Sequence, residues 1–161
     1  MRTTESTVQV VVFALGGIEL ALNVSEVREI NRLSPIRRLP HVAACIRGVI
    51  NQRGQLVPVV DLRARLGLRP KAPPKTARII VAELGDRCMG MIVDRVCEVM
   101  HVSADQIDDS EAVLAGLAAE YVGGLAKVDG RVIILLALQN ILGAGIPAAE
   151  APALSADKDR A

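Results

Sequence analysis

The sequence predicts an all-β fold made of two small barrels or barrel-like sheets, with a few short helices. Three observations lead to this prediction, namely short aliphatic runs, glycine-containing turns between them, and an internal repeat. Of the 161 residues 51% are hydrophobic, yet there is one Phe, one Tyr and no Trp. We therefore expect an aliphatic core, and a chain of this length buries roughly 70% of the surface that its unfolded form exposes.

The internal repeat extends over two successive segments of each copy. The aligned residues are 13–30 with 82–99 at an offset of 69, then 48–60 with 124–136 at an offset of 76. Glycines stay in register, with Gly48 on Gly124 and Gly54 on Gly130. Two long segments in the same order indicate a duplication rather than chance. The copies are expected at about 8–68 and 77–143, joined by a proline-containing linker.

Each copy contains hairpin signals, in which β-favouring runs flank a two-residue turn with glycine. The predicted turns are Gly16-Gly17, Arg53-Gly54, Gly85-Asp86 and Asp129-Gly130. Glycine suits these turns because it adopts positive φ without a steric penalty. Short helices are expected over 61–66 before Gly67, over 139–142 before Gly143, and over 111–120. Ser103 to Gln106 has the spacing of a capping box.

The two ends of the chain and its cysteines indicate the cellular compartment of the protein. We expect residues 1–7 to be flexible and the Ala- and Pro-rich residues 144–161 to be disordered. A polar N-terminus and the lack of an apolar run of about 18 residues predict no signal peptide and no membrane insertion. The odd number of widely spaced cysteines, Cys45, Cys88 and Cys97, predicts buried free thiols in the reducing cytoplasm.

The charge distribution limits the classes of partner. The formal net charge is +1, but residues 28–71 hold ten Lys or Arg against two acids, Glu29 and Asp61. This stretch predicts either a solvated basic face or a face that meets an acidic protein. Nucleic-acid binding is the competing function for a small barrel, but a near-neutral charge and few aromatic residues for base stacking disfavour it.

The sequence lacks the residue patterns of catalysis. His41 and His101 have no cysteine or acid at ligand spacing, so we expect no metal and no cofactor. No nucleophile elbow or phosphate-binding loop is present, so we expect no enzyme. The repeat relates Glu29 to Glu98, and these carboxylates could pair across a pseudo-twofold axis. A structural role for them is favoured over acid–base chemistry.

One segment, residues 47–54, has the features of a contact surface. Arg53 lies at the tip of a predicted turn beside Gly54, and arginine is enriched at interfaces because its planar guanidinium binds carboxylates and carbonyls with defined geometry. An exposed turn arginine without a partner is the equally weighted alternative.

The chain resembles the CheW family of chemotaxis coupling proteins, from about residue 8 to residue 143. The similar segments are VSEVREI (24–30), IRRLPHVAACIRGVINQRGQLVPVVDLRARLGL (36–68), MGMIVDRVCEVM (89–100) and YVGGLAKVDGRVIILL (121–136). The second segment, with its G-V-I-N-x-R-G and V-P-V-V-D-L-R strings, is the most specific of the four.

The resemblance implies a fold of two SH3-like five-stranded β-barrels packed around a shared core. It implies a non-catalytic, cytoplasmic adaptor, monomeric alone, that couples the cytoplasmic tips of chemoreceptors to the histidine kinase CheA in membrane-bound arrays. A paralogue in a pilus or developmental pathway is the alternative. The family fold allows strands to cross between the barrels, so the boundary of the repeat need not be that of a barrel.

The resemblance also assigns roles to residues. Val27 and Glu29 match a family motif for receptor contact, and Arg53 matches another functional position, with Gly48 and Gly54 holding its turn. Structural roles are expected for Asn51 as a backbone hydrogen-bonder, for Asp61 as a helix cap, and for Gly124 and Gly130 in the second copy. Ala137 replaces an acidic residue of the family, so the last cap is expected to be weaker.

Overall fold

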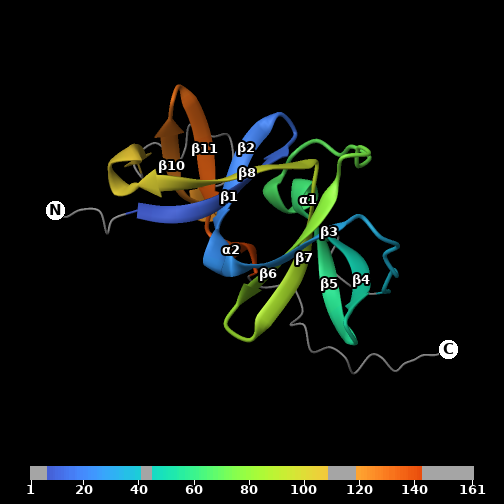
Figure 1. Ribbon diagram of the computed structural model, residues 1–161. Coiled ribbons are helices and arrows are strands. Elements are labelled where there is room, and N and C mark those ends of the chain that lie inside the picture. Colours follow the sequence, from blue (N-terminus) through green and yellow to red (C-terminus); the bar gives the residue numbers. More distant parts are fainter. Residues whose placement is uncertain (1–6, 41–44, 109–118, 143–161) are drawn as a thin grey trace.

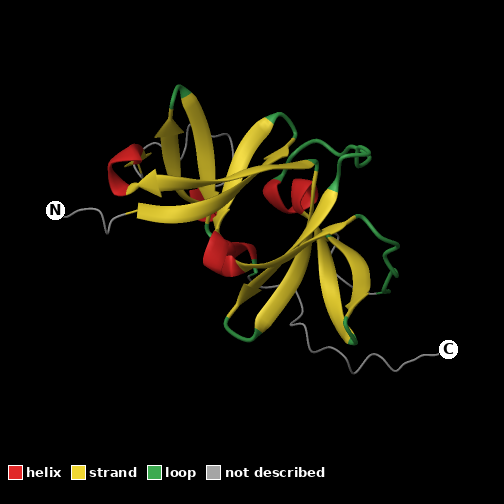
Figure 2. Cartoon of the chain, in the orientation of Figure 1, coloured by secondary structure: helices red, strands yellow, loops and turns green. Residues whose placement is uncertain are grey.

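The computed structural model describes residues 7–40, 45–108 and 119–142, whose strands form two curved sheets (Figures 1 and 2). Sheet A has the order β8-β1-β2-β11-β10-β9. Its strands are β1 (Thr7–Leu15), β2 (Ile18–Asn23), β8 (Arg95–Ser103), β9 (Ile107–Asp108), β10 (Val122–Val128) and β11 (Arg131–Leu136). Sheet B has the order β3-β6-β7-β5-β4. Its strands are β3 (Val27–Arg32), β4 (Ile46–Gln52), β5 (Gln55–Asp61), β6 (Arg78–Leu84) and β7 (Arg87–Val93).

The predicted all-β two-barrel architecture is confirmed, with one addition. Sheet B has the five expected strands, whereas sheet A gains β9, a sixth strand of two residues. The helical segments are short, as expected. They are α1 (Leu62–Leu66), α2 (Leu138–Ile141) and the 3-10 turns η2 (Val24–Glu26), η3 (Ala104–Gln106) and η5 (Ala119–Tyr121). The helix expected over 111–120 falls mainly outside the described residues, as do Gly143 and both ends of the chain.

The predicted turns connect the strands as expected. Gly16-Gly17, Arg53-Gly54 and Asp129-Gly130 have positive φ at both residues, as a type I′ hairpin requires. Helix α1 ends at Gly67, whose φ of 78° is left-handed. Helix α2 begins one residue earlier than the sequence predicts. Gln106 accepts a hydrogen bond from the Ser103 backbone N–H at 2.9 Å, which completes one half of the expected capping box.

The two copies of the repeat exchange strands. Sheet B joins β3, β4 and β5 of the first copy to β6 and β7 of the second, while sheet A joins β8, β10 and β11 of the second to β1 and β2 of the first. The registers correspond as well, because Glu29 lies opposite Val81 in sheet B and Glu98 lies opposite Val12 in sheet A. Both sheets also contain one parallel pair, β5 with β7 and β11 with β2. Neither copy therefore forms a barrel by itself.

The buried residues form three clusters, because strands of each sheet contribute apolar residues both to a cluster of their own sheet and to a shared one. One cluster fills sheet B and includes Val57, and a second fills sheet A and includes Ile133. The third is shared by both sheets. It includes Phe13 and Leu20 from sheet A, Met89 and Met91 from sheet B, and Leu62 and Leu138 from the helices. The shared core expected from the resemblance is thus present, and it joins the two barrels into one body.

Candidate functional site

Glu29 and Arg53, both predicted contact residues, lie together at one end of sheet B. The Arg53 guanidinium is 3.4 Å from the Glu29 carboxylate, and its side chain is 77% exposed against 22% for Glu29. Next to this pair, the Asn31 side-chain amide donates a hydrogen bond to Gln52 Oε1 at 2.9 Å. Strands β3 and β4 are the two edges of the sheet, so these contacts hold the edges together and close the barrel.

The β4–β5 turn that carries Arg53 is held in an unusual backbone conformation. Asn51 Oδ1 accepts a hydrogen bond from the Gly54 backbone N–H at 2.9 Å, so Asn51 does act on the backbone. Arg53 itself has a φ of 56°, in the left-handed region that favours Gly, Asn and Asp. The repeat-related position holds Asp129 with a φ of 49°. An arginine at this position is therefore not explained by the turn.

Val27 and Gly48 do not join Arg53 at the turn. Val27 is half-buried, lies opposite Ala82 and packs against the shared core. Gly48 lies near the other end of β4, where a Cβ atom would approach the Arg37 carbonyl oxygen to 2.0 Å. The backbone N–H and carbonyl of Val49 are hydrogen-bonded to Arg37, which explains this close approach. The predicted contact residues are therefore distributed along sheet B.

The predicted structural positions lie as follows. Asp61 precedes α1, and its carboxylate accepts hydrogen bonds from the backbone N–H groups of Arg63 at 3.1 Å and Ala64 at 3.4 Å. Ala137 precedes α2 without a side-chain cap. Gly130 lies in the β10–β11 turn, and Gly124 lies where the register of β10 against β11 shifts by one residue.

Glu29 and Glu98 do not pair with each other, so that possibility is ruled out. Glu98 is 3.0 Å from Arg131, whose guanidinium also contacts Glu19 through two bonds of 3.1 Å. The hydrogen bonds that Arg131 donates to these carboxylates raise its pKa above the ordinary value. Each glutamate has its own arginine, and the two arginines occupy different positions of their hairpins. Charge is therefore neutralised differently in the two sheets.

The prediction that all three thiols are buried is wrong for two of them. Cys45 and Cys97 are half-buried, while Cys88 is buried, and all three are free. Burial raises the pKa of the Cys88 thiol, and the Arg28 guanidinium, 3.8 Å from its sulfur, partly opposes this shift. Cys45 directly precedes β4, and Cys97 lies in β8 at the register shift against β1, which an apolar sequence window does not reveal.

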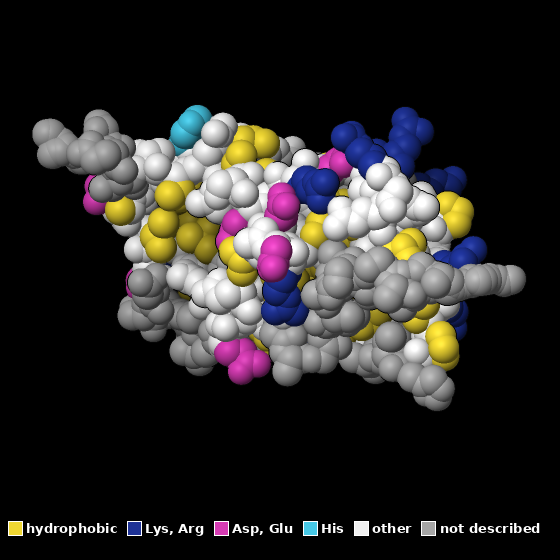
Figure 3. All heavy atoms as spheres, turned by 90° about the horizontal axis from the view of Figure 1, so that it is seen from below, with side chains coloured by type: hydrophobic (Ala, Val, Ile, Leu, Met, Phe, Trp, Pro, Cys, Tyr) yellow, Lys and Arg dark blue, Asp and Glu magenta, His cyan; other side chains and the backbone are white. Residues whose placement is uncertain are grey.

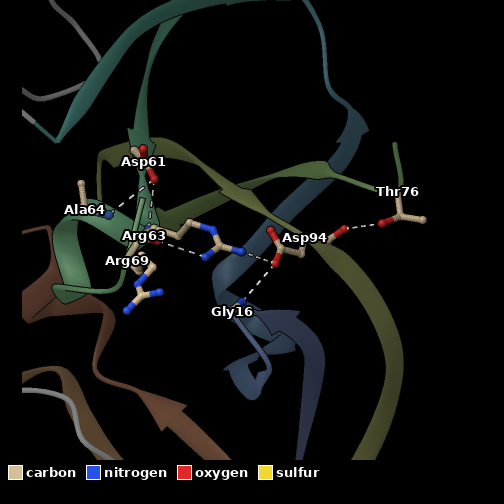
Figure 4. Close-up of polar contacts among 7 residues, drawn as sticks. All are labelled: Gly16, Asp61, Arg63, Ala64, Arg69, Thr76 and Asp94. Atoms are coloured by element: carbon tan, nitrogen blue, oxygen red, sulfur yellow. Dashed lines mark hydrogen bonds and ion pairs between the residues drawn. The ribbon is translucent and has the colours of Figure 1, made fainter. Parts of the chain in front are cut away.

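A buried ion pair, not predicted from the sequence, holds the point where the chain crosses from sheet B to sheet A (Figure 4). Asp94, between β7 and β8, accepts hydrogen bonds from Arg63 at 2.5 Å and from the Gly16 backbone N–H at 3.0 Å. The Arg63 side chain is only 8% exposed, and it also donates to the Arg69 carbonyl at 3.2 Å. Thr76 donates to the Asp94 carbonyl at 2.7 Å.

We call Arg63, Asp94 and these partners the junction. The signal available in the sequence is indirect. The repeat places uncharged Gln139 on Arg63 and uncharged Ser25 on Asp94, so both members of the pair interrupt the similarity of the copies. The chain passes between the sheets twice, after β2 and after β7. The junction lies at the second passage, and its two charged residues have no charged counterparts at the first.

The described residues offer neither a metal site nor a membrane-spanning helix. In ranges 7–40, 45–108 and 119–142, no group of three or more His, Cys, Asp or Glu side chains lies close enough to hold a metal ion. No helix in those ranges is both long and apolar enough to cross a membrane.

Comparison with known proteins gives a consistent result. Residues 9–145 match the family model described as CheW-like domain. The probable chemotaxis protein CheW of Rhizobium etli is 34% identical over 133 residues, which are 83% of this chain and 86% of that protein. Protein PilI of Pseudomonas aeruginosa is 30% identical over 113 residues, which are 70% of this chain and 64% of that protein.

A solved structure shares the fold. The scaffolding protein TtCheW from Thermoanaerobacter tengcongensis superposes with a TM-score of 0.81 at 30% identity, covering 88% of this chain and 96% of that one. The matched family model spans both sheets and the site at the β4–β5 turn. The chain therefore belongs to the CheW family of chemotaxis scaffold proteins.

Proposed function

We propose that this protein is a non-catalytic adaptor that couples chemoreceptors to the histidine kinase CheA, with Arg53 and Glu29 at the contact surface. One observation carries the assignment of the site, which is the left-handed conformation of Arg53. A non-glycine residue in this conformation costs about 1–2 kcal/mol, and short polar residues reduce the cost. A long, 77% exposed arginine at such a position supports a role in contact with a partner.

The surroundings of Arg53 suit recognition of a helical segment. Glu29 places a negative charge beside the positive charge of Arg53, so a partner with groups of both signs would be electrostatically complementary to this pair. Val27, two residues before Glu29 on β3, is half-buried and adds apolar surface. An amphipathic helix such as a receptor tip would place aliphatic side chains near Val27 and polar ones near the Arg53–Glu29 pair.

The mechanism that follows is positional. An adaptor changes the activity of a kinase only through contacts that differ between the states of the kinase, and no bond is made or broken. Two faces are needed, one for the receptor and one for the kinase, and a rigid body must connect them. The shared core and the junction supply that rigidity. Recruitment of the adaptor from the cytoplasm to membrane-bound receptor arrays follows from the same contacts.

The test is co-purification with the cognate CheA and a soluble receptor signalling fragment. We expect Arg53→Asn to weaken binding at least tenfold, about 1.4 kcal/mol, without lowering the melting temperature, because asparagine tolerates the left-handed conformation better than arginine. The matched control is Asp129→Asn, at the equivalent turn of sheet A, which should bind normally. Val27→Asp is a less selective variant because Val27 packs against the core.

Two results would contradict the proposal. One is unchanged binding by Arg53→Asn to both partners, and the other is an equal loss for Arg53→Asn and Asp129→Asn. The similarity to Protein PilI supports the alternative of a coupling protein in a pilus-type pathway. Repeating the co-purification with the kinases of both kinds of pathway distinguishes these alternatives.

A further inference from the structure

Positive charge gathers where strands β3 and β5 of sheet B end and where β4 and β6 begin. Strands β3, β5 and β7 run toward this end, and β4 and β6 run away from it. Arg32 at the end of β3, Arg78 at the start of β6 and Arg47 near the start of β4 therefore lie there. We call this the basic end, together with Arg38 and Lys71, which line adjoining hollows with Arg47.

Figure 3 shows the same bias over a wider area. On the face that it presents, Lys and Arg side chains gather over the end of the molecule that carries sheet B, and acidic side chains lie toward the centre and sheet A. The two acids of the basic sequence stretch are already engaged, Glu29 with Arg53 and Asp61 with Arg47. Arg32, Arg38 and Lys71 are exposed and have no ion pair or hydrogen bond with the described residues.

Two arginines of the basic end repel each other across the sheet. Arg32 lies directly opposite Arg78, and like charges in such a pair destabilise a sheet. Arg78 donates to the carbonyls of Thr76 at 3.2 Å and Ala77 at 2.8 Å, and within residues 7–40, 45–108 and 119–142 no carboxylate pairs with it. The equivalent pair in sheet A is Gln9 opposite His101. The fold therefore does not require two cations at this position, and an anion from outside the chain would relieve their repulsion.

A partly apolar hollow lies beside these charges. It has a volume of about 230 Å³ and is lined by Leu33, Ser34, Ile36, Arg38, Arg47, Pro73 and Ile92. Leu33 is 39% exposed, which is unusual for a large aliphatic side chain beside a strand end. A hollow of this size accepts one apolar side chain, and the arginines around it suit carboxylates, which their planar guanidinium groups bind through two bonds.

We propose that the basic end of sheet B binds an acidic linear segment of a partner protein, with one apolar side chain of that segment in the hollow. Carboxylates would contact Arg32, Arg38 and Lys71. The apolar lining favours a peptide over nucleic acid, since no described aromatic side chain at the hollow offers a base a surface to stack on. This surface includes neither Arg53 nor Glu29, and its partner is an acidic segment, so it goes beyond the coupling function proposed above.

The probe is a fluorescein-labelled peptide of glutamates interrupted by two leucines, titrated with the full chain at low and moderate salt. We expect saturable binding that weakens with salt. The double variant Arg32→Gln/Arg38→Gln should bind at least tenfold more weakly. Its melting temperature should not fall, because the variant removes the repulsion between Arg32 and Arg78. The matched control is Arg95→Gln, an exposed arginine of sheet A, which should bind like the unaltered protein.

Further probes separate this proposal from its competitors. A peptide with serine in place of leucine should bind several-fold more weakly, and equal binding would refute the role of the hollow. Tighter binding of single-stranded DNA or of phosphatidylserine vesicles than of the acidic peptide would overturn the choice of partner. Unchanged binding by the double variant would overturn the site. Arg53 is intact in all these variants, so the result is independent of the co-purification test.

Discussion

Sheets A and B share the order and register of five equivalent strands, and sheet A adds β9. Val27, Glu29, Gly48 and Gly54 are unchanged in the second copy, where they are Val96, Glu98, Gly124 and Gly130. The two sheets differ at two other places, since Arg53 and the pair Arg32–Arg78 of sheet B correspond to Asp129 and the pair Gln9–His101 of sheet A. The interiors differ little, since equivalent strands supply aliphatic residues to the cluster of each sheet and to the shared cluster. The comparison indicates that the two copies retained similar apolar interiors, while the surface of sheet B changed at positions for which we propose binding.

The largest expected effect tests whether the interiors are equivalent. Val57 and Ile133 are related by the repeat and are both 0% exposed. Val57→Asp and Ile133→Asp each place an unpaired charge in an apolar cluster, which we expect to cost about 4 kcal/mol or more and to leave most of the chain unfolded. Circular dichroism during heating and the soluble yield measure this. If only one of the two variants unfolded, the two interiors would not be equivalent.

The second prediction concerns the two crossings between the sheets. Arg63→Ala removes one member of a buried ion pair, so we expect the free energy of unfolding to fall by about 2–4 kcal/mol. Asp94→Ala should have a similar effect, and the double variant should lose less than the sum. The matched control is Gln139→Ala, since Gln139 is the exposed repeat partner of Arg63 and should change stability by less than about 0.5 kcal/mol. Equal decreases in the free energy of unfolding for Arg63→Ala and Gln139→Ala would show that the junction does not stabilise the connection between β7 and β8.

Local features of this fold were predictable because their chemistry is local. The glycine turns, the cap at Asp61 and the end of α1 at Gly67 each depend on residues adjacent in the sequence. The exchange of strands was not predictable. Both copies have the same apolar pattern, so β1 and β2 could pair with β3, β4 and β5 of their own copy or with β8, β10 and β11 of the other. The structure has the second arrangement, and the sequence pattern does not distinguish the two.

The candidate site was predictable residue by residue but not as an arrangement. Glu29 and Arg53 could be named from motifs, whereas their ion pair depends on how the edges of sheet B meet. The junction escaped detection because Arg63 and Asp94 belong to different copies. The repulsion between Arg32 and Arg78 likewise became visible only once β3 and β6 were known to be neighbours.

The smallest expected effect compares the 3-10 turns that follow β2 and β8. In η3, neutral Gln106 accepts a hydrogen bond from the Ser103 backbone N–H, and in η2 the carboxylate of Glu26 accepts one from Asn23 at 3.3 Å. Partial burial raises the pKa of Glu26 above 4.5, with the Asn23 hydrogen bond opposing the shift. The folded state therefore binds a proton more readily than the unfolded state, so this group favours folding as the pH falls through the window just above 4.5.

Glu26→Gln makes the η2 turn chemically like η3. It keeps an oxygen that can accept from Asn23 and removes the burial of a charge, so at neutral pH we expect the melting temperature to rise by at most about 2 °C. The stability difference between the variant and the original should shrink as the pH is lowered, because protonation of Glu26 has the same effect as the substitution. Melting curves at several pH values measure this difference. A lower melting temperature at neutral pH would mean that the charge of Glu26 stabilises the crossing, and that η2 and η3 hold their chains by different forces.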